Sequence, residues 1–451
     1  MPVNASLQKP TQVLTHRNTV TWRIFIPWQR AGLFPSLLAA ACLLFFVGQA
    51  RCQEALRMSL AGNMAAESRR QAVSSIGYYN LLSGPVAWRF TTSLAMDYQD
   101  NVGLQSQNKQ GDLIIRPNLN TQMHWPVTLK NSLDASLGVG YSFYVRRSDL
   151  DQVYVTPGSG LSFDIYVGNC VINLHDRVSV TQSAYQNPTA NGSTSFAQLE
   201  NSAGVSATWD MNKLVAQFGY DHATDTSIGS GRQVADTASD NWSASAGLHL
   251  LPQLTAGVEG GLGLISYGQS QSASTQPDAL QWNAGVFAQA QISEYISGKL
   301  DAGYTVYTPD ATATFANPAS SSGIYFQFSL THELNQFISY SLSAGRSTES
   351  SVFGQPYTLY FARLQPDWKV FKKYSLSTPV FWQKGSQLAT RLYGSGGSSD
   401  YTQYGAGFNI GRPLTRKLTA SLAYQYIREN STQSGPTYTL NTVSLNLSYQ
   451  F

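Results

Sequence analysis

The last 15 residues of the chain alternate between apolar and polar side chains, and this alternation limits the folds open to the protein. From residue 442 onward, one set of alternate positions carries Val443, Leu445, Leu447, Tyr449 and Phe451, and the other carries Thr442, Ser444, Asn446, Ser448 and Gln450. A β-strand with this pattern has one apolar and one polar face. A water-soluble sheet seldom ends on such a strand, because an apolar outer face invites aggregation. A strand that closes a barrel in a membrane requires the pattern, because its outer face contacts lipid and its inner face contacts water.

The same alternation recurs from residue 88 to the end of the chain. In 133–146, for example, Leu133, Leu137 and Phe143 share one face, opposite Asp134 and Ser142. We count eighteen such segments: 88–98, 112–125, 133–146, 160–168, 171–183, 201–211, 214–222, 240–250, 253–266, 280–292, 295–307, 323–333, 336–346, 357–370, 373–383, 400–410, 417–428 and 437–451. Most reach the roughly 9–11 residues that a tilted strand needs to cross a bilayer. The sequence therefore predicts an all-β fold, a transmembrane antiparallel up-and-down β-barrel of 18 strands. Sixteen strands remain the alternative if 160–168 and 171–183 are irregular.

The connections between these segments alternate between short and long. Short connections include 210–213, 251–252, 293–294 and 372–373, and long ones, rich in Gly, Ser, Thr, Asp and Asn, include 266–279, 307–322 and 383–399. Short turns on one side and long loops on the other are typical of an outer-membrane barrel. With an even strand number and a periplasmic start, the C-terminus returns to the periplasm.

The N-terminal part precedes the alternating region and has a different character. Residues 1–30 carry Arg17, Arg23 and Arg30, and 31–47 is an uncharged apolar run followed by small residues at positions 48 and 50. This pattern predicts a leader and secretory signal peptide over 1–50, with an uncleaved membrane helix as the alternative. We expect 51–85 to be a periplasmic N-terminal segment, either a short helix or a plug, and 86–451 to be the barrel. Cys52 and Cys170 would remain in the mature chain, and their spacing leaves open whether they pair.

Composition and histidine placement argue against several classes of function. Only 12% of residues are charged and the formal net charge is +3, which gives no support for nucleic-acid binding. We find no metal-ligand spacing and expect no cofactor. An enzymatic barrel would need a nucleophile–base pair at its rim or outer face. Of the histidines, only His222, beside Asp221, lies where a long loop begins. A solvated loop explains this dipeptide better than catalysis, and we expect no enzymatic activity.

Tryptophans lie near the ends of the predicted strands and on their apolar faces. The residues are Trp88, Trp125, Trp209, Trp242, Trp282, Trp368 and Trp382. Indole rings prefer the headgroup level of a membrane, so this placement predicts an aromatic girdle. Packing in a soluble sandwich core is the weaker alternative.

The opposite parity predicts which side chains face the interior of the barrel. The charged ones are Arg89, Asp97, Asp134, Arg146, Lys299, Asp301 and Arg363. Charge is tolerated in a water-filled lumen but not in lipid. Mixed signs argue against strong selectivity for anions or cations. The rest of this face, Ser, Thr, Asn, Gln, Gly and some Tyr, suits small neutral solutes or sugars, or it simply solvates the wall.

Three segments and the C-terminus resemble a family of outer-membrane β-barrel porins of Gram-negative bacteria. The segment 84–102, GPVAWRFTTSLAMDYQDNV, resembles the opening of that family, with Asp100 and Asn101 in its acidic loop. The segments 112–119 and 201–222 are similar to later strands, and Tyr449 with Phe451 resembles the C-terminal signal that the barrel-assembly machinery reads. The resemblance covers about residues 84–451, supports the fold rather than an activity, and supplies no catalytic residues.

Together these features lead to the expected function. We expect a porin-like channel in the outer membrane for passive diffusion of small hydrophilic solutes. The alternative is a structural or export component of an exopolysaccharide secretion system, to which some relatives of the family are linked. Expected partners are outer-membrane lipid and lipopolysaccharide, the assembly machinery, a polysaccharide or small solute, and a second copy of the chain as a homo-oligomer, but not nucleic acid.

Overall fold

The computed structural model describes residues 79–181, 197–228, 236–268, 277–311, 320–350, 356–371, 373–387, 400–431 and 437–451. The predicted signal peptide, residues 51–78 with Cys52, most of the long connections and the Gly-rich stretch 394–398 lie outside these ranges.

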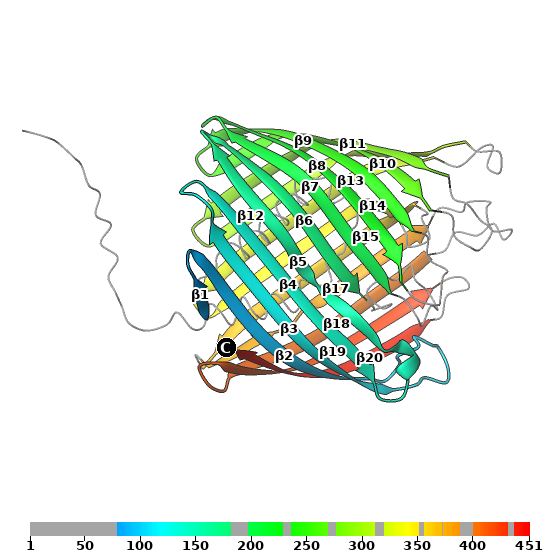
Figure 1. Cartoon of the computed structure of the whole chain (residues 1–451). Coiled ribbons are helices and arrows are strands. Elements are labelled where there is room, and N and C mark those ends of the chain that lie inside the picture. Colours follow the sequence, from blue (N-terminus) through cyan, green and yellow to red (C-terminus); the bar gives the residue numbers. More distant parts are fainter. Residues whose placement is uncertain are drawn as a thin grey trace, which may run out of the picture.

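The described chain is almost entirely β-strand (Figure 1). The strands are β1 (Leu81–Ser83), β2 (Val86–Gln99), β3 (Asp112–Pro126), β4 (Asn131–Tyr144), β5 (Gln152–Val167), β6 (Cys170–Thr181), β7 (Gln198–Asp210), β8 (Leu214–Ser227), β9 (Thr237–Leu251), β10 (Leu254–Tyr267), β11 (Ala279–Ser293), β12 (Ile296–Pro309), β13 (Ser321–Asn335), β14 (Ile338–Ser350), β15 (Pro356–Val370), β16 (Tyr374–Ser377), β17 (Val380–Gln387), β18 (Asp400–Pro413), β19 (Leu418–Ser431) and β20 (Tyr438–Gln450). A 3-10 turn, η2 (Ser148–Leu150), follows β4. No helix in these ranges is long and apolar enough to cross a membrane.

These segments form one closed antiparallel barrel of 18 strands. Each strand pairs with its neighbour in sequence, and β2 pairs with β20 from Thr91↔Gln450 to Gln99↔Thr442, which closes the sheet. The structure has 20 strand segments, but β16 and β17 occupy the place of one strand between β15 and β18. Pro379 separates them without a change of register, because proline has no N–H to donate to the ladder. The short β1 pairs with the first residues of β2, before the stretch that pairs with β20, and adds no strand to the circle. The predicted count of 18 is confirmed.

The two ends of the barrel differ in their connections. At one end, adjacent strands are joined by tight turns, such as the two residues between β9 and β10 and between β11 and β12. The C-terminus lies at this short-turn end, and the strand ends from which the longer connections start lie at the opposite end (Figure 1). We call the latter the long-loop end. The arrangement matches the predicted alternation of turns and loops.

Strand boundaries differ from prediction on either side of the loop after β4. The predicted strand 133–146 ends at Tyr144, and the predicted strand 160–168 begins eight residues earlier, at Gln152. The early part of β5 was missed because Pro157 and Gly158 break the alternation and read as a turn. The structure instead places a bulge there, where Gly158 has a φ of +97°.

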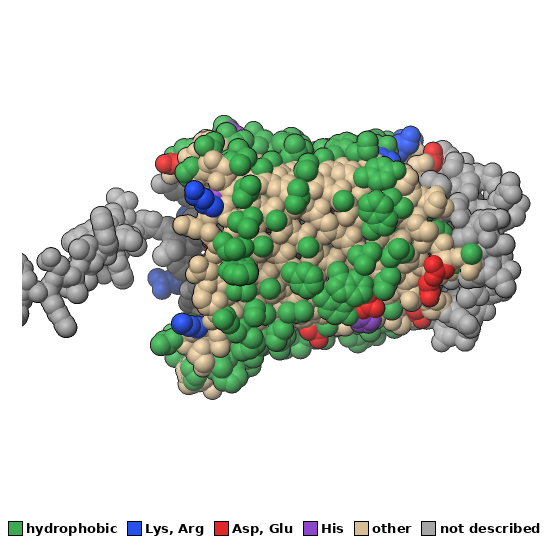
Figure 2. Space-filling model, turned by 90° about the horizontal axis from the view of Figure 1, so that it is seen from above, with side chains coloured by type: hydrophobic (Ala, Val, Ile, Leu, Met, Phe, Trp, Pro, Cys, Tyr) green, Lys and Arg blue, Asp and Glu red, His purple; other side chains and the backbone are tan. Residues whose placement is uncertain are grey.

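The barrel has its apolar face outside. Leu137, Val258 and Ile324 are 51%, 58% and 63% exposed, whereas inward-facing Asp134 and Asp301 are 1% and 2% exposed. Hydrophobic side chains are spread over the outer wall from one end of the strands to the other (Figure 2). A soluble protein places these two classes of side chain the other way round.

Candidate functional site: the inner wall of the barrel

The inner wall carries charged side chains of both signs. Directly opposed residues on neighbouring strands point to the same side of the sheet, so the register assigns each residue to a face. Leaving out two residues at each strand end, the inward-facing carboxylates are Asp97, Asp134, Asp164, Glu200, Asp221, Asp225, Glu259, Asp301, Glu333, Asp367 and Glu429. The inward-facing cationic side chains, by the same rule, are Arg89, Arg116, Arg177, Lys299 and Arg363. Within the described ranges this wall therefore holds eleven carboxylates and five cationic groups.

A row of four residues across β10–β13 shows how the wall is packed. Glu259 is opposite Gly285, Gly285 is opposite Gly303, and Gly303 is opposite Tyr325. The Tyr325 hydroxyl donates a 2.9 Å hydrogen bond to Glu259 Oε1, although two strands separate the residues. The ring reaches across because both intervening residues are glycine. A Cβ at Gly285 would lie 2.2 Å from Tyr325 Oη, and one at Gly303 would lie 2.6 Å from Tyr325 Cε1.

Aromatic rings pack over glycines at other positions around the barrel. At four further places, on three strand pairs, an inward-facing aromatic ring lies against a glycine of a neighbouring strand: Tyr154 on Gly140, Phe361 on Gly345, Tyr401 on Gly385 and Phe381 on Gly405. Glycine weakens a strand when it stands alone, and a ring laid over it restores packing. The rings lie along the wall, which helps to explain why inward-facing residues are buried in so wide a barrel.

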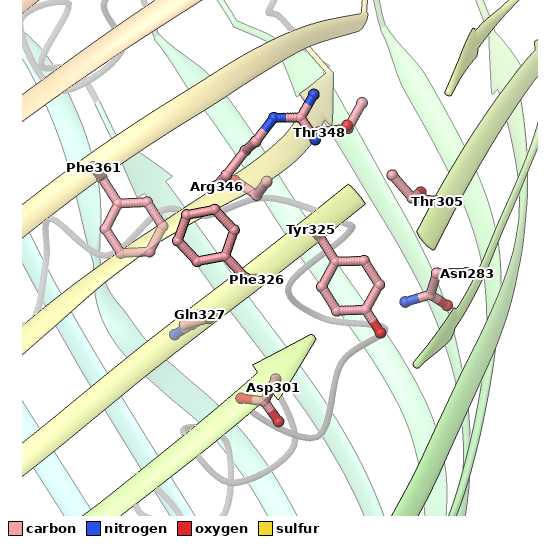
Figure 3. Close-up of a pocket in the computed structure, with 10 residues that line it drawn as sticks. Asn283, Asp301, Thr305, Tyr325, Phe326, Gln327, Arg346, Thr348 and Phe361 are labelled. Atoms are coloured by element: carbon pink, nitrogen blue, oxygen red, sulfur yellow. The ribbon is translucent and has the colours of Figure 1, made fainter. Parts of the chain in front are cut away.

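A pocket in this wall lies beside Tyr325 (Figure 3). Its polar lining includes Asn283, Asp301, Thr305 and Gln327, and Tyr325 points toward Asn283 in this view. Asp301 Oδ1 lies 3.0 Å from Lys299 Nζ on the same strand, and both side chains are less than a tenth exposed. The lining can donate and accept hydrogen bonds and carries a carboxylate.

A second polar network joins the last strands before closure. Gln383 Nε2 donates to Gln403 Oε1 at 2.8 Å, and Gln403 Nε2 donates to Glu429 Oε2 at 3.1 Å. The Tyr438 hydroxyl also donates to Glu429 Oε2, at 3.1 Å. Glu429 is completely buried. The network links β17, β18, β19 and β20 on the inner face.

Toward the long-loop end the inner wall becomes apolar and aromatic. Buried inward-facing side chains there include Ile265, Tyr267, Tyr307, Tyr357, Leu359, Tyr401, Ile427, Tyr438 and Leu440. The hydroxyls of Tyr267 and Tyr307 lie 3.1 Å apart. The expected lining of Ser, Thr, Asn and Gln is thus found mainly in the rest of the wall.

Asp221 and His222 face opposite sides of the wall. Asp221 Oδ1 lies 2.7 Å from His175 Nε2 inside the barrel, and His222 Nδ1 lies 2.9 Å from Asp240 Oδ1 outside it. Ser202 Oγ contacts Asp221, at 3.4 Å, so this group has a carboxylate between hydroxyl and imidazole. A nucleophilic triad requires the imidazole between them. No group of residues that could hold a metal ion occurs in the described ranges.

Six of the seven residues predicted to line the lumen lie on the inward-facing side of their strands. Asp97 pairs with Arg116, Asp134 lies 2.6 Å from His124 Nδ1, and the guanidinium of Arg363 lies 5.6 Å from the centre of the Phe361 ring. Arg89 shares the β2 face of Asp97, and Lys299 and Asp301 form the ion pair described above. That these residues contact a solute stays a prediction.

Arg146, the seventh predicted residue, lies outside the strands of the wall, and its contact with a solute also stays a prediction. It lies beyond the end of β4, and its backbone N–H donates to the Asp112 carboxylate at 3.0 Å. Asp112 also accepts a hydrogen bond from the N–H of Arg147, so its carboxylate fixes the backbone at the start of the loop after β4. Arg147 in turn hydrogen-bonds Asp149, which holds the pKa of that carboxyl below its usual range. Asp112, Asp149 and the two arginines thus contact one another at the start of this loop.

The predicted girdle tryptophans occupy outward-facing positions. Trp125, Trp209, Trp282, Trp368 and Trp382 are between 37% and 53% exposed, and Trp88 and Trp242 are partly covered. Phe451 is 49% exposed and contacts Tyr449 edge-to-face, with ring centres 5.4 Å apart. A role in anchoring the protein in a membrane or in its insertion remains a prediction. Within the described ranges Cys170, at the start of β6, forms no disulfide.

Sequence reasoning missed Glu259, Tyr325 and Glu429, which organise the inner wall. For Glu259 and Tyr325 the inward direction was available from the sequence, because Val258 and Ile324 beside them are outward-facing and apolar. Glu429 stands between Arg428 and Asn430, so its immediate neighbours gave no such signal. Which glycines and amides they meet was not available, because that depends on pairing between strands.

No protein-family model and no curated protein sequence matches the chain. Similar solved structures include OccAB3 of Acinetobacter baumannii, at 11% identity and a TM-score of 0.45, covering 81% of this chain and 99% of that one. OpdQ of Pseudomonas aeruginosa has 12% identity and a TM-score of 0.46, covering 81% and 98% of the two chains. The outer membrane protein OpdK of the same organism has 13% identity and a TM-score of 0.45, with the same coverage. Sequence identities and TM-scores this low do not indicate which solutes this protein binds or transports.

Proposed function

We propose that this protein is a porin-like channel in the outer membrane of a Gram-negative bacterium, through which small hydrophilic solutes diffuse passively. The observation that carries the proposal is the closed barrel of 18 strands with an apolar outer face and a polar inner face. Closed barrels leave no unpaired strand edge in lipid, where an unsatisfied backbone group costs several kcal/mol. Barrels of about 16–18 strands are wide enough for an aqueous channel.

The inner wall supports transport better than catalysis. Its polar groups are distributed along several strands, as in the separate clusters around Glu259, Glu429 and Asp221. A catalytic site would gather a nucleophile, a base and an orienting group at one point. Lipid and lipopolysaccharide around the apolar wall, and insertion by the assembly machinery through the C-terminal aromatic residues, belong to the same proposal.

Single-channel recording tests this function directly. The chain from Arg51 to Phe451 would be refolded and added to a planar lipid bilayer in KCl. We expect stable, ohmic current steps that persist at both polarities. A correctly folded barrel that gives no steps would contradict a passive channel and would favour a structural or export role in polysaccharide secretion.

A further inference from the structure

The charges on the inner wall are unevenly distributed around the barrel. On β5–β12 the inward-facing carboxylates are Asp164, Glu200, Asp221, Asp225, Glu259 and Asp301, against the two cations Arg177 and Lys299. The remaining described strands hold five carboxylates and three cations by the same rule. We call the inner face of β5–β12 the acidic wall.

Two carboxylates of the acidic wall are direct neighbours. Glu200 on β7 is opposite Asp225 on β8 in the register. Like charges placed directly opposite each other destabilise a sheet, so such a pair needs compensation from its surroundings. Ser179 Oγ donates to Glu200 Oε2 at 3.1 Å, and Thr237 Oγ1 donates to Asp225 Oδ2 at 3.4 Å. These two hydroxyl groups orient the carboxylates.

Buried amide oxygens provide a second, independent observation on the same wall. Gln198 Oε1, Asn241 Oδ1 and Asn283 Oδ1 have no hydrogen-bond donor within the described ranges, and each side chain is at least nine-tenths buried. All three face inward, on β7, β9 and β11, and Asn241 is opposite Asp221. An amide oxygen without a protein donor is costly to bury unless water or a cation satisfies it. Carboxylate and carbonyl oxygens together form the lining that conducts cations in other channels.

The chain after residue 78 also has an excess of acidic side chains, in agreement with the excess of carboxylates on the inner wall. Residues 1–78 contain eight of the 29 Lys and Arg and two of the 26 Asp and Glu, so residues 79–451 carry 21 cationic and 24 acidic side chains. The positive charge of the whole chain therefore comes from its N-terminal part.

We infer that the lumen prefers cations, and that its natural solutes are small and positively charged. This inference rests on the proposed channel function and adds the charge class of the solute. Fixed charge on a low-dielectric wall raises the local concentration of ions of opposite sign, and the effect depends on the sum of the wall charges. Mixed signs in the sequence suggested weak selectivity, but the register shows that inward-facing carboxylates outnumber inward-facing cationic groups, eleven to five, within the described ranges.

The test is the reversal potential of the refolded channel in a KCl gradient. We expect a sign that corresponds to preferred passage of K⁺ over Cl⁻, and a smaller preference at high salt, where screening shortens the reach of the wall charges. The double variant Glu200→Gln with Asp225→Asn keeps both side-chain shapes and removes two charges. We expect it to lower the K⁺/Cl⁻ permeability ratio by roughly a factor of two or more.

Asp176→Asn is the matched control. Asp176 lies next to Arg177 on β6 but faces outward, where its Oδ1 accepts a hydrogen bond from Asn201. We expect the control to leave the permeability ratio unchanged. Preferred passage of Cl⁻, or a ratio that the double variant leaves unaltered, would overturn the inference while the channel function stands. Absence of current would instead contradict the channel function itself.

If the double variant does not fold, the salt dependence of the K⁺/Cl⁻ permeability ratio of the unmodified channel still tests the inference. A K⁺ preference that falls as KCl is raised from about 0.1 to 1 M supports fixed wall charge, because the screening length falls from about 10 to 3 Å. A preference that does not change with salt would overturn it.

Discussion

His175 Nε2 lies 2.7 Å from Asp221 Oδ1 on the inner wall, although 46 positions separate the two residues in the chain. The residue after Asp221, His222, points to the other side of the wall and meets Asp240 at 2.9 Å. The protein therefore contains two histidine–carboxylate contacts of similar length, one inside the barrel and one outside. Their environments differ: His175 is 6% exposed at its side chain and His222 is 47% exposed.

This difference predicts unequal costs of removing the carboxylate. Asp221→Ala leaves a buried imidazole without its acceptor, and we expect it to lower the free energy of unfolding by about 1–3 kcal/mol. Asp240→Ala removes a partner from an exposed histidine, and we expect a loss of less than about 1 kcal/mol. Urea unfolding of the refolded barrel in lipid vesicles, followed by tryptophan fluorescence, measures both. Equal losses would show that the inner contact gains nothing from burial.

The glycines beneath Tyr325 should not tolerate a methyl group. Gly285→Ala places its Cβ 2.2 Å from Tyr325 Oη, so the ring must move away from Glu259. We expect a destabilisation of about 1–3 kcal/mol from this overpacking. Gly298→Ala is the control, because its nearest neighbouring atom would be 3.5 Å away. The same unfolding measurement applies, and a Gly285→Ala variant as stable as the control would mean that Tyr325 does not depend on this space.

The Tyr438 hydroxyl should contribute to the stability of the closing strands. Tyr438→Phe removes the donor to the buried carboxylate of Glu429 and keeps the ring. We expect a loss of about 1–3 kcal/mol, because Glu429 is completely buried and cannot replace the donor with water. Tyr98→Phe, at an outward-facing position that is 51% exposed, serves as the control. Hydrogen exchange along β18–β20 would localise the effect, and unchanged exchange there would contradict it.

The last residue should matter for assembly more than for stability. Phe451 is exposed, and its N–H reaches Phe90 O at 3.4 Å, so its side chain has few contacts to lose. We expect Phe451→Ala to change the free energy of unfolding by less than about 0.5 kcal/mol, as for most surface substitutions. In cells, we expect it to reduce the amount of barrel in the outer membrane severalfold, measured by membrane fractionation. A normal amount of the Phe451→Ala variant in the outer membrane would contradict a role of this residue in insertion.

Much of the architecture could be predicted from the sequence. The eighteen alternating segments correspond to the eighteen strands of the barrel, and the parity of Asp97, Lys299 and Asp301 gave their inward direction. The predictions failed where local signals mislead. Pro157 and Gly158 hid the first half of β5, and the apparent alternation continued past the true end of β4 to Arg146.

The composition of the inner wall was only partly predictable. The expected small polar residues are present, but the buried aromatic side chains near the long-loop end, such as Tyr267 and Tyr307, were not expected in that number. Their parity was readable from the sequence. Their clustering was not readable, because it depends on how three or four neighbouring strands are aligned along the barrel axis.

The sequence by itself determined most of the strands and the face on which their side chains lie, and it left their number at 18 or 16. These properties are local, because the side-chain direction alternates with every residue of a strand whatever its partners are. The tertiary structure alone decided which residues meet. The register between strands follows from the closure and stagger of the whole barrel, and it places Tyr325 across two glycines from Glu259, His175 against Asp221, and Glu200 opposite Asp225.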